Sequence, residues 1–517
     1  MLWLALHLPA LPLEAFCATL PAEQRSCPTV LLQEHRVHTV NGAAVQRGIK
    51  PGIKRATAMA LAADLLLAQS CPQRNAAALL AVAHAALAFT PAVCLHGEPP
   101  LHLVLLEVQG SLRLFGGLQK LQQKLLASLA PLGHQVQMAA APTAWGAALL
   151  ALWSPPAAVV ATDLVHGPHA TDLAMLQTLL DAAPVWLLGP GRQHWEALQG
   201  MGLQTVADLR ALPRSGVTRR FGQALLDDLD RALGLQPDPR TWLQAPPRFD
   251  SRLELFARAD TTEQVLHAAQ VLLARLVAWA QARQGRIAGF GLRMLHESRR
   301  QVATPATELQ VQLAEPALDP AHLQLLLRER LAHCTLAAPT LELHLHCQHL
   351  VASPAPNGEL FPTHASHDQG LTRLLERLCA RLGEDRVCRL VAVADHRPER
   401  ASRSVAATVA TTAAARHAGH HTPNEVEPSA LPLQRPVWLL PEPMPLAERE
   451  SLPCLQGRPL QLLSGPERIE TGWWDGHPVA RDYFIAMATD GSLVWIYRGR
   501  LPVAGDEPSW YLQGRFA

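Results

Sequence analysis

The chain has 517 residues, more than one ordinary hydrophobic core supports, so the sequence predicts several domains. Its formal net charge of +1 gives no overall basic character, so any contact with nucleic acid must come from local patches. Nine cysteines occur without a CxxC pair. That pattern argues against a zinc ribbon, a thioredoxin-like site or a disulfide scaffold, and a reducing cytoplasm is the expected setting.

Arginine supplies nearly all of the positive charge, because the chain has only four lysines. Arginine suits phosphate binding, but codon bias produces the same composition, and the sequence does not separate the two. The stretch from 135 to 161 is uncharged and long enough to cross a bilayer. Three prolines, Pro142, Pro155 and Pro156, interrupt it. We therefore predict a buried strand and a core helix there, and no membrane contact.

The first part of the chain alternates strand-like and helix-like segments. Residues 2–8 predict a short buried strand, and alanine-rich helices extend through residue 90. A strong strand is expected at 101–108, an amphipathic helix at 118–129 and another strand at 135–141. Alternation of this kind indicates an α/β core in the first 165 residues.

The rest of the chain contains four segments that differ in composition and in their expected secondary structure. Residues 171–234 are helical and punctuated by glycine, and 248–350 follow the order strand, helix, strand, strand, helix, strand. The two helices of that second segment are expected near 262–283 and 320–333. Residues 399–432 are low in large apolar groups, so they predict a flexible linker. A small β-rich domain with many Trp and Tyr residues follows at 433–517.

Four short motifs occur in the order found in Y-family DNA polymerases. Residues 48–53 (GIKPGI) resemble the fingers motif, and 110–116 (GSLRLFG) resemble the palm segment after the catalytic strand. Residues 141–143 (APT) resemble the "GIAPNK" turn. Residues 188–191 with 202–209 resemble the helix–hairpin–helix of the thumb. Each motif is short, but their shared order over about 170 residues supports the resemblance.

Three further segments resemble the ImuB-type branch of that family: 2–9, 212–222 and 465–483. The resemblance implies an α+β multidomain fold with Y-family polymerase architecture and an added C-terminal β-rich domain. It implies a palm at 1–165 with fingers inserted at about 20–90, and a thumb at 166–240. A little finger at 246–398 would include a clamp-binding loop at 353–370.

The resemblance also places the catalytic positions of the family. Active members use three carboxylates on two palm strands to hold two metal ions, which clamp the reacting oxygens. Those positions fall at His7, His102 and Leu103. Imidazole is a poor magnesium ligand and leucine is none. The resemblance therefore implies an inactive polymerase homologue with no catalytic residue, no metal and no cofactor.

The contacts to the incoming triphosphate are replaced as well. The fingers positions fall at Gly42 and Val45, and the lysine position after the turn falls near Ala148. Glu107 remains, either as a lone metal ligand or as a strand-end carboxylate in a polar contact. His7 and His102 either form a new site or fill structural positions.

Binding functions are implied by other residues. Backbone N–H groups of the hairpin glycines would face a DNA phosphate. Nearby arginines would add salt-sensitive phosphate contacts or else be solvated surface charges. The predicted DNA-binding residues are Gly189, Gly191, Arg192, Arg214, Arg219 and Arg220. The little finger adds Arg286, Arg293, Arg299 and Arg300 as candidates.

Two other segments offer alternatives. Asn357, Leu360 and Phe361 resemble a degenerate peptide that binds the bacterial sliding clamp, although an incidental Leu-Phe pair in a loop fits too. His344, His346, Cys347 and His349 suggest a metal site, but alternation with leucines favours a half-buried strand with a solvated face.

The aromatic tail provides the last set of candidates. Trp473, Trp474 and Tyr483 are predicted to bind a partner, while most other aromatic residues of the tail build the core. The hypothesis is a scaffold for damage-induced mutagenic translesion synthesis. It would hold DNA, the sliding clamp, a RecA-like accessory protein and an error-prone C-family polymerase.

Two rival hypotheses stay open. One is an active polymerase with a displaced metal site, for which Glu107, Asp64 and Glu98 are the available carboxylates. The other is a generic DNA-binding module, which predicts that the first 165 residues lack a palm-like sheet.

Overall fold

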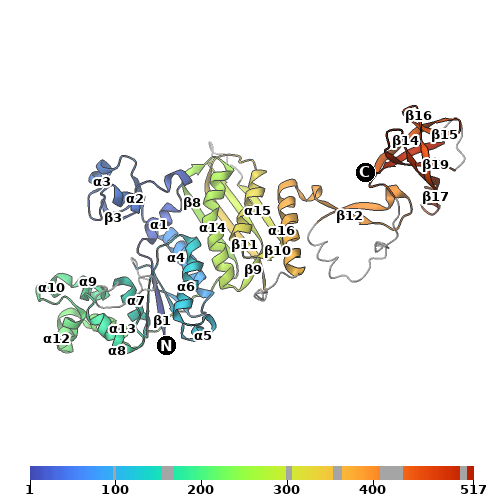
Figure 1. Cartoon of the computed structure of the whole chain (residues 1–517). Coiled ribbons are helices and arrows are strands. Elements are labelled where there is room, and N and C mark those ends of the chain that lie inside the picture. Colours follow the sequence, from blue (N-terminus) through green and yellow to red (C-terminus); the bar gives the residue numbers. More distant parts are fainter. Residues whose placement is uncertain are drawn as a thin grey trace. The chain divides into compact units, whose positions relative to one another are not determined.

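The computed structural model describes residues 1–96, 101–153, 168–297, 306–352, 364–407, 435–500 and 509–516. These residues form two compact units, Met1–Arg381 and Leu382–Ala517 (Figure 1). The predicted clamp-binding residues Asn357, Leu360 and Phe361 lie outside the described residues, as do Glu98, Arg299 and Arg300.

The predicted palm is built on a four-stranded antiparallel sheet in the order β5-β6-β1-β7. The strands are β1 (Trp3–His7), β5 (Val93–His96), β6 (Leu103–Glu107) and β7 (Gln137–Ala141). They are short and apolar, as expected of strands buried on both faces. The predicted strands at 2–8, 101–108 and 135–141 are confirmed, so a generic module without such a sheet is excluded.

Helices cover both faces of this sheet. The face with Leu4 and Leu6 packs against α1 (Leu11–Cys17), α4 (Pro72–Leu87) and α6 (Leu118–Leu129). The face with Trp3, Ala5 and Leu105 packs against α7 (Ala144–Trp153). The strand and core helix predicted within 135–161 are thus confirmed as β7 and α7.

A smaller lobe contains the predicted fingers. Its sheet has the order β3-β2-β4, with β2 (Thr29–Gln33), β3 (Arg36–Val40) and β4 (Leu66–Gln69). The helices α2 (Gly42–Gln46) and α3 (Arg55–Leu61) complete a separate apolar core. The predicted limit near residue 90 is too long, because α4 buries its alanines against the palm sheet instead. Figure 1 shows this lobe in blue beside the palm.

The predicted thumb is entirely helical within the described residues 168–240. It contains α8 (Leu173–Asp181), α9 (Gly189–Gln193), α10 (Trp195–Gly200), α11 (Val206–Arg210), α12 (Arg214–Phe221) and α13 (Gln223–Leu233). Thr205 and Asp208 form a reciprocal capping box that starts α11. The apolar sides of these helices join the core on the α7 face of the palm.

The predicted little finger has the expected order of two helices and four strands. Its elements are β8 (Phe249–Ala259), α14 (Thr262–Ala282), β9 (Gly285–His296), β10 (Thr307–Ala317), α15 (Pro320–Ala332) and β11 (Thr340–Ala352). The sheet order is β10-β9-β11-β8, and the two helices share one core with it (Figure 1). Helix α16 (His364–Leu382) adds Ala380 to that core.

Helix α14 is long and apolar enough to cross a membrane by length and composition alone. In this fold, 72% of its most apolar window is buried inside the protein. Its leucines pack against β9 and β11, so its hydrophobicity is explained by its place in the core of the little finger.

The second unit holds a hairpin and a larger sheet. The hairpin pairs β12 (Cys388–Ala392) with β13 (Ser402–Ala406). This corrects two predicted boundaries. Residues 382–398 belong with the C-terminal unit rather than with the little finger, and 402–406 are a strand rather than linker. The low apolar content of 399–432 hid β13, which is held by backbone pairing to β12 rather than by large side chains.

The predicted β-rich terminal domain is confirmed as a seven-stranded sheet in the order β16-β15-β14-β20-β19-β18-β17. Its strands are β14 (Trp438–Arg449), β15 (Leu452–Leu455), β16 (Arg458–Pro459), β17 (Gln461–Thr471), β18 (Val479–Met487), β19 (Leu493–Gly499) and β20 (Trp510–Arg515). Apolar clusters lie on both sides of β19, one around Ile496 and one around Trp495.

Candidate functional site

The positions predicted to have lost catalytic carboxylates lie together in the palm sheet. His7 on β1 is the register partner of Leu103 on β6. The N–H of Leu8 donates to the carbonyl oxygen of His102 at 3.0 Å. Residues separated by almost a hundred positions thus meet at one corner of the sheet, where carboxylates at positions 7 and 103 would lie side by side.

The side chains present at this corner suit a structural role. Leu103 is fully buried. The Nδ1 atom of His7 lies 3.1 Å from the side-chain oxygen of Gln137. Burial lowers the pKa of His7, and burial together with the nearby His7 lowers the pKa of His102. Both imidazoles are therefore neutral near pH 7, and the corner lacks the anionic oxygens that a magnesium ion prefers.

Of the candidate carboxylates, the two that the structure describes, Glu107 and Asp64, are not near this corner. Glu107 is paired with Trp3 at the opposite end of the two strands, about 13 Å away for four residue steps. Its side chain accepts the N–H of Gln109 at 3.1 Å, which supports the polar-contact interpretation. Asp64 lies in the fingers, 3.8 Å from Arg47. Across the described ranges, no group of three or more His, Cys, Asp or Glu residues is placed to hold a metal ion.

The histidine-rich segment of the little finger is a strand, as the alternation predicted. On β11, the Nε2 atom of His344 lies 2.7 Å from a carboxylate oxygen of Asp250. The neighbouring Cys347 is buried in the core cluster, and its thiol donates to the carbonyl of Gly289 at 3.2 Å. Cys347 thus faces away from His344, and within the described ranges no group of three or more His, Cys, Asp or Glu residues is placed to hold a metal ion, so the metal alternative does not fit this segment.

Two positions predicted to have lost triphosphate contacts carry apolar side chains. Val45 is an exposed residue of α2, where a methyl-bearing side chain offers no hydrogen bond to a phosphate. Ala148 is fully buried in α7 against the palm sheet. A lysine at that position would have to displace part of this core. Alanine therefore differs from lysine here in packing as well as in charge.

The two predicted phosphate-binding glycines have structural partners. The N–H of Gly189 donates to a carboxylate oxygen of Asp228 at 3.1 Å, and burial raises the pKa of this acid. A Cβ atom on Gly191 would lie 2.2 Å from the carbonyl oxygen of Val185. Gly189 thus anchors the hairpin to α13, and Gly191 allows close backbone packing. Their contact with DNA stays a prediction.

The predicted thumb arginines fall into two groups. Arg214 is bonded to the buried Asp230 at 2.5 Å, and this hydrogen bond raises the arginine pKa. Arg219 and Arg220 are exposed at the end of α12 and form no ion pair with any described residue. Arg192 is exposed and lies over the ring of Trp186. The last three are therefore available to phosphates, whereas Arg214 already has an anionic partner.

The open face of the little-finger sheet carries mixed charge. Exposed Arg293 on β9 is the register partner of Glu308 on β10 and of His344 on β11. His344 in turn is the register partner of Arg252 on β8. Arg286 is half-buried. Acidic residues interleave with the predicted arginines, a feature that counting arginines along the sequence did not reveal.

In the terminal domain, only part of the predicted aromatic surface is exposed. Trp473 and Trp474 are 74% and 58% exposed, with ring centroids 4.7 Å apart. Tyr483 is 1% exposed, stacks on Trp495 and donates its hydroxyl to Gln513 at 2.6 Å. The prediction that Tyr483 binds a partner directly is wrong, because its side chain on β18, between β17 and β19, lies in the core.

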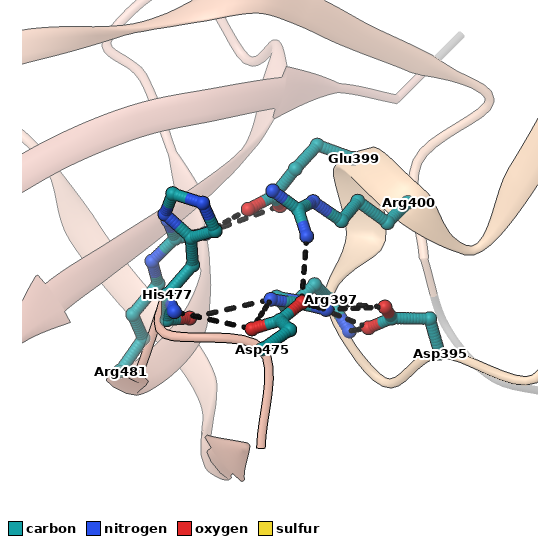
Figure 2. Close-up of polar contacts among 7 residues, drawn as sticks. All are labelled: Asp395, Arg397, Glu399, Arg400, Asp475, His477 and Arg481. Atoms are coloured by element: carbon teal, nitrogen blue, oxygen red, sulfur yellow. Dashed lines mark hydrogen bonds and ion pairs between the residues drawn. The ribbon is translucent and has the colours of Figure 1, made fainter. Parts of the chain in front are cut away.

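A buried arginine that the sequence did not indicate holds the loop next to these tryptophans. Arg397 donates to Asp395 at 2.7 Å and to Asp475 at 2.6 Å, and Arg400 donates to Asp475 at 2.8 Å (Figure 2). These bonds lower the pKa of Asp475 to about 2. Asp475 directly follows Trp474, so the cluster fixes the loop that carries both exposed rings. Arg397 and Asp475 are too far apart in sequence for a local pattern to link them.

Comparisons with curated proteins identify relatives along most of the chain. No family model matches the chain. Two curated relatives, both named Protein ImuB and from Caulobacter vibrioides strains NA1000 / CB15N and ATCC 19089 / CIP 103742 / CB 15, are each 30% identical over 482 residues. Each match covers 91% of this chain and 100% of the relative. The chain belongs to the ImuB family.

Solved structures similar to this ImuB-family chain are Y-family polymerases. A Dbh ternary complex matches with a TM-score of 0.36 and 14% identity. DinB from Sulfolobus solfataricus matches with a TM-score of 0.35 and 17% identity. Each covers 68% of this chain and 100% of its own. The described residues of this ImuB-family protein form an α+β fold with an added C-terminal β-rich domain.

Proposed function

We propose that this ImuB-family protein is a non-catalytic polymerase-like scaffold for damage-induced mutagenic translesion synthesis in the cytoplasm. It holds DNA, the sliding clamp, a RecA-like accessory protein and an error-prone C-family polymerase, which performs the nucleotidyl transfer. The observation that carries the proposal is the corner where His7 meets Leu103. Transfer through two metal ions needs anionic oxygen ligands, and this corner offers a buried leucine and neutral imidazoles instead.

Primer extension tests the missing activity. Purified full-length protein with a primed template, all four deoxynucleotides and magnesium or manganese should add no nucleotide. The matched control is Glu107→Gln, prepared in the same way, because a contaminating polymerase would act equally in both samples. Extension by the wild type that disappears in Glu107→Gln would overturn the proposal in favour of a displaced metal site.

The clamp contact is tested by a pull-down with purified sliding clamp. The double variant Leu360→Ala/Phe361→Ala should lose binding, because the proposed peptide offers both side chains to an apolar pocket. Leu374→Ala is the control, since Leu374 is an exposed leucine of α16 outside the motif. Equal capture of the double variant and the wild type would discard the clamp role of this segment.

The other proposed partners are tested by capture from damaged cells followed by mass spectrometry. Replacing Trp473 and Trp474 together by alanine should remove a partner that docks on these rings, with little effect on folding because both are exposed. Recovery of the same proteins by both versions would show that this pair is not a docking site.

A further inference from the structure

The thumb has an open pocket that is lined by two tryptophans and one arginine. The two glycines of the hairpin are not part of this lining. Trp186 lies in the short helix Val185–Leu187, Arg192 in α9 and Trp195 in α10. These three side chains line a cavity of about 310 Å³. The guanidinium carbon of Arg192 lies 5.9 Å from the centroid of the Trp186 ring, which is 37% exposed.

The local sequence explains why these groups face outward. Val185 and Leu187, which flank Trp186 in the sequence, are buried in the core. The indole of Trp186 therefore lies at the surface. Gly191 packs against the carbonyl of Val185, which brings the start of α9 close to the short helix. Arg192 follows Gly191 and therefore lies over Trp186. An exposed indole contributes little to the core, and its ring is accessible to a stacking partner.

Cationic groups continue from this pocket along the thumb. The ring of His194, which precedes Trp195, lies 5.6 Å from the ring of Phe221. The guanidinium carbon of Arg220 lies 5.9 Å from the centroid of the same Phe221 ring, and Arg219 is adjacent. Aromatic faces beside a row of positive charges are what single-stranded nucleic acid needs, because bases stack on the rings and phosphates pair with the charges.

We propose that the pocket of Trp186, Arg192 and Trp195 binds an unpaired nucleobase of single-stranded DNA by stacking. The exposed Arg219 and Arg220 hold phosphates of the same strand. Bases in a duplex are stacked on each other, so the pocket selects single strands or gaps over intact duplex. This inference rests on the proposed DNA binding and adds a contact to bases, which backbone N–H groups and arginines alone do not provide.

The test compares two single strands with the same number of phosphates, an oligothymidine and an abasic strand. Fluorescence anisotropy with the full-length protein should give roughly tenfold tighter binding of the oligothymidine, because stacking on an aromatic ring contributes on that scale. Trp186→Ala should reduce the oligothymidine affinity to that of the abasic strand and leave the abasic affinity unchanged. Trp186→Phe should retain most of the difference, which separates loss of the ring from loss of the fold.

Trp438→Ala is the matched control, because Trp438 is an exposed tryptophan of β14 in the other unit, and it should change neither affinity. Equal affinity of the wild type for both strands would overturn the base pocket while leaving phosphate binding intact. A Trp186→Ala variant that retains the full preference for oligothymidine would also overturn it. Failure of the wild type to bind either strand would overturn the proposed DNA binding as well.

Discussion

The palm and the thumb belong to the same compact unit and share one apolar core. They differ in which side chains are exposed and able to bind a ligand. In the palm, at the corner where the resemblance places the catalytic carboxylates, Leu103 is fully buried and His7 and His102 are half-buried. In the thumb, Arg192, Arg219 and Arg220 stay exposed, and Trp186 stays partly exposed. A buried leucine stabilises a sheet but offers no ligand to a metal ion. Solvated arginines cost the fold little and can be kept for binding.

The largest effect is expected where a carboxylate is returned to the palm. Leu103→Glu places an acid in a fully buried position without a partner, so unfolding free energy should fall by about 3 kcal/mol or more. Leu103→Met is the volume-matched control and should cost less than about 1.5 kcal/mol. Chemical denaturation measures both. A Leu103→Glu protein as stable as the wild type would mean that the corner is open to solvent, as in an active site.

A second test of the buried palm uses pH. His84 of α4 is buried, and burial lowers its pKa to about 4. The unfolded chain binds a proton near pH 6.5 and the folded chain does not, so stability falls as pH decreases from about 6.5 to 4, by roughly 3 kcal/mol in total. His84→Leu and His84→Gln should both flatten this part of the profile, measured by denaturation at several pH values. An unchanged slope in both variants would assign the dependence to other groups.

In the thumb, the two hairpin glycines are expected to differ in how much stability an added methyl group costs. Gly191→Ala should destabilise the protein by about 1–3 kcal/mol, because the new methyl group meets the carbonyl of Val185. Gly189→Ala should cost less, since nothing lies within 4 Å of its added Cβ. Thermal melting of the two variants measures the difference. If Gly189→Ala were the more damaging variant, the assignment of the close packing to Gly191 would be wrong.

The smallest effect concerns the exposed thumb arginines. Replacing Arg219 and Arg220 by alanine should leave stability within about 0.5 kcal/mol and make the salt dependence of DNA binding less steep by about one unit per arginine. Arg214→Ala is the comparison, because its partner Asp230 would be left buried and unpaired. It should lower stability and change the salt dependence less. Anisotropy titrations at several salt concentrations provide the slopes, and identical slopes in all variants would exclude these arginines from phosphate contact.

Elements with strong periodicity were predictable. The helices expected at 262–283 and 320–333 are α14 (Thr262–Ala282) and α15 (Pro320–Ala332). Apolar residues at helical spacing over a long segment can be buried together on one face only if the segment forms a helix. Boundaries between domains were less predictable. The sequence places helix α4 in the fingers because its alanines suit either core, whereas the structure packs them against the palm sheet. The sequence does not predict strand β13, because this segment has few large apolar groups.

Candidate site residues were predictable in identity but not in exposure. Tyr483 and Trp473 are both aromatic residues of the tail, yet Tyr483 is buried on strand β18 and Trp473 is 74% exposed on a loop. Arg214 and Arg219 are neighbours on one helix, yet only Arg214 meets a buried acid, Asp230. Such differences depend on contacts with distant segments, which residue type and spacing do not encode.

The sequence by itself determined which chemical groups this protein has: no carboxylate at His7, His102 and Leu103, and arginine as its main cation. It also determined the order of helices and strands, because periodicity is a local property of the chain. The tertiary structure alone decided that His7 and Leu103 meet in register and that Arg397 holds Asp475. Pairing between strands and burial of charges depend on residues far apart in sequence, so they exist only once the chain has folded.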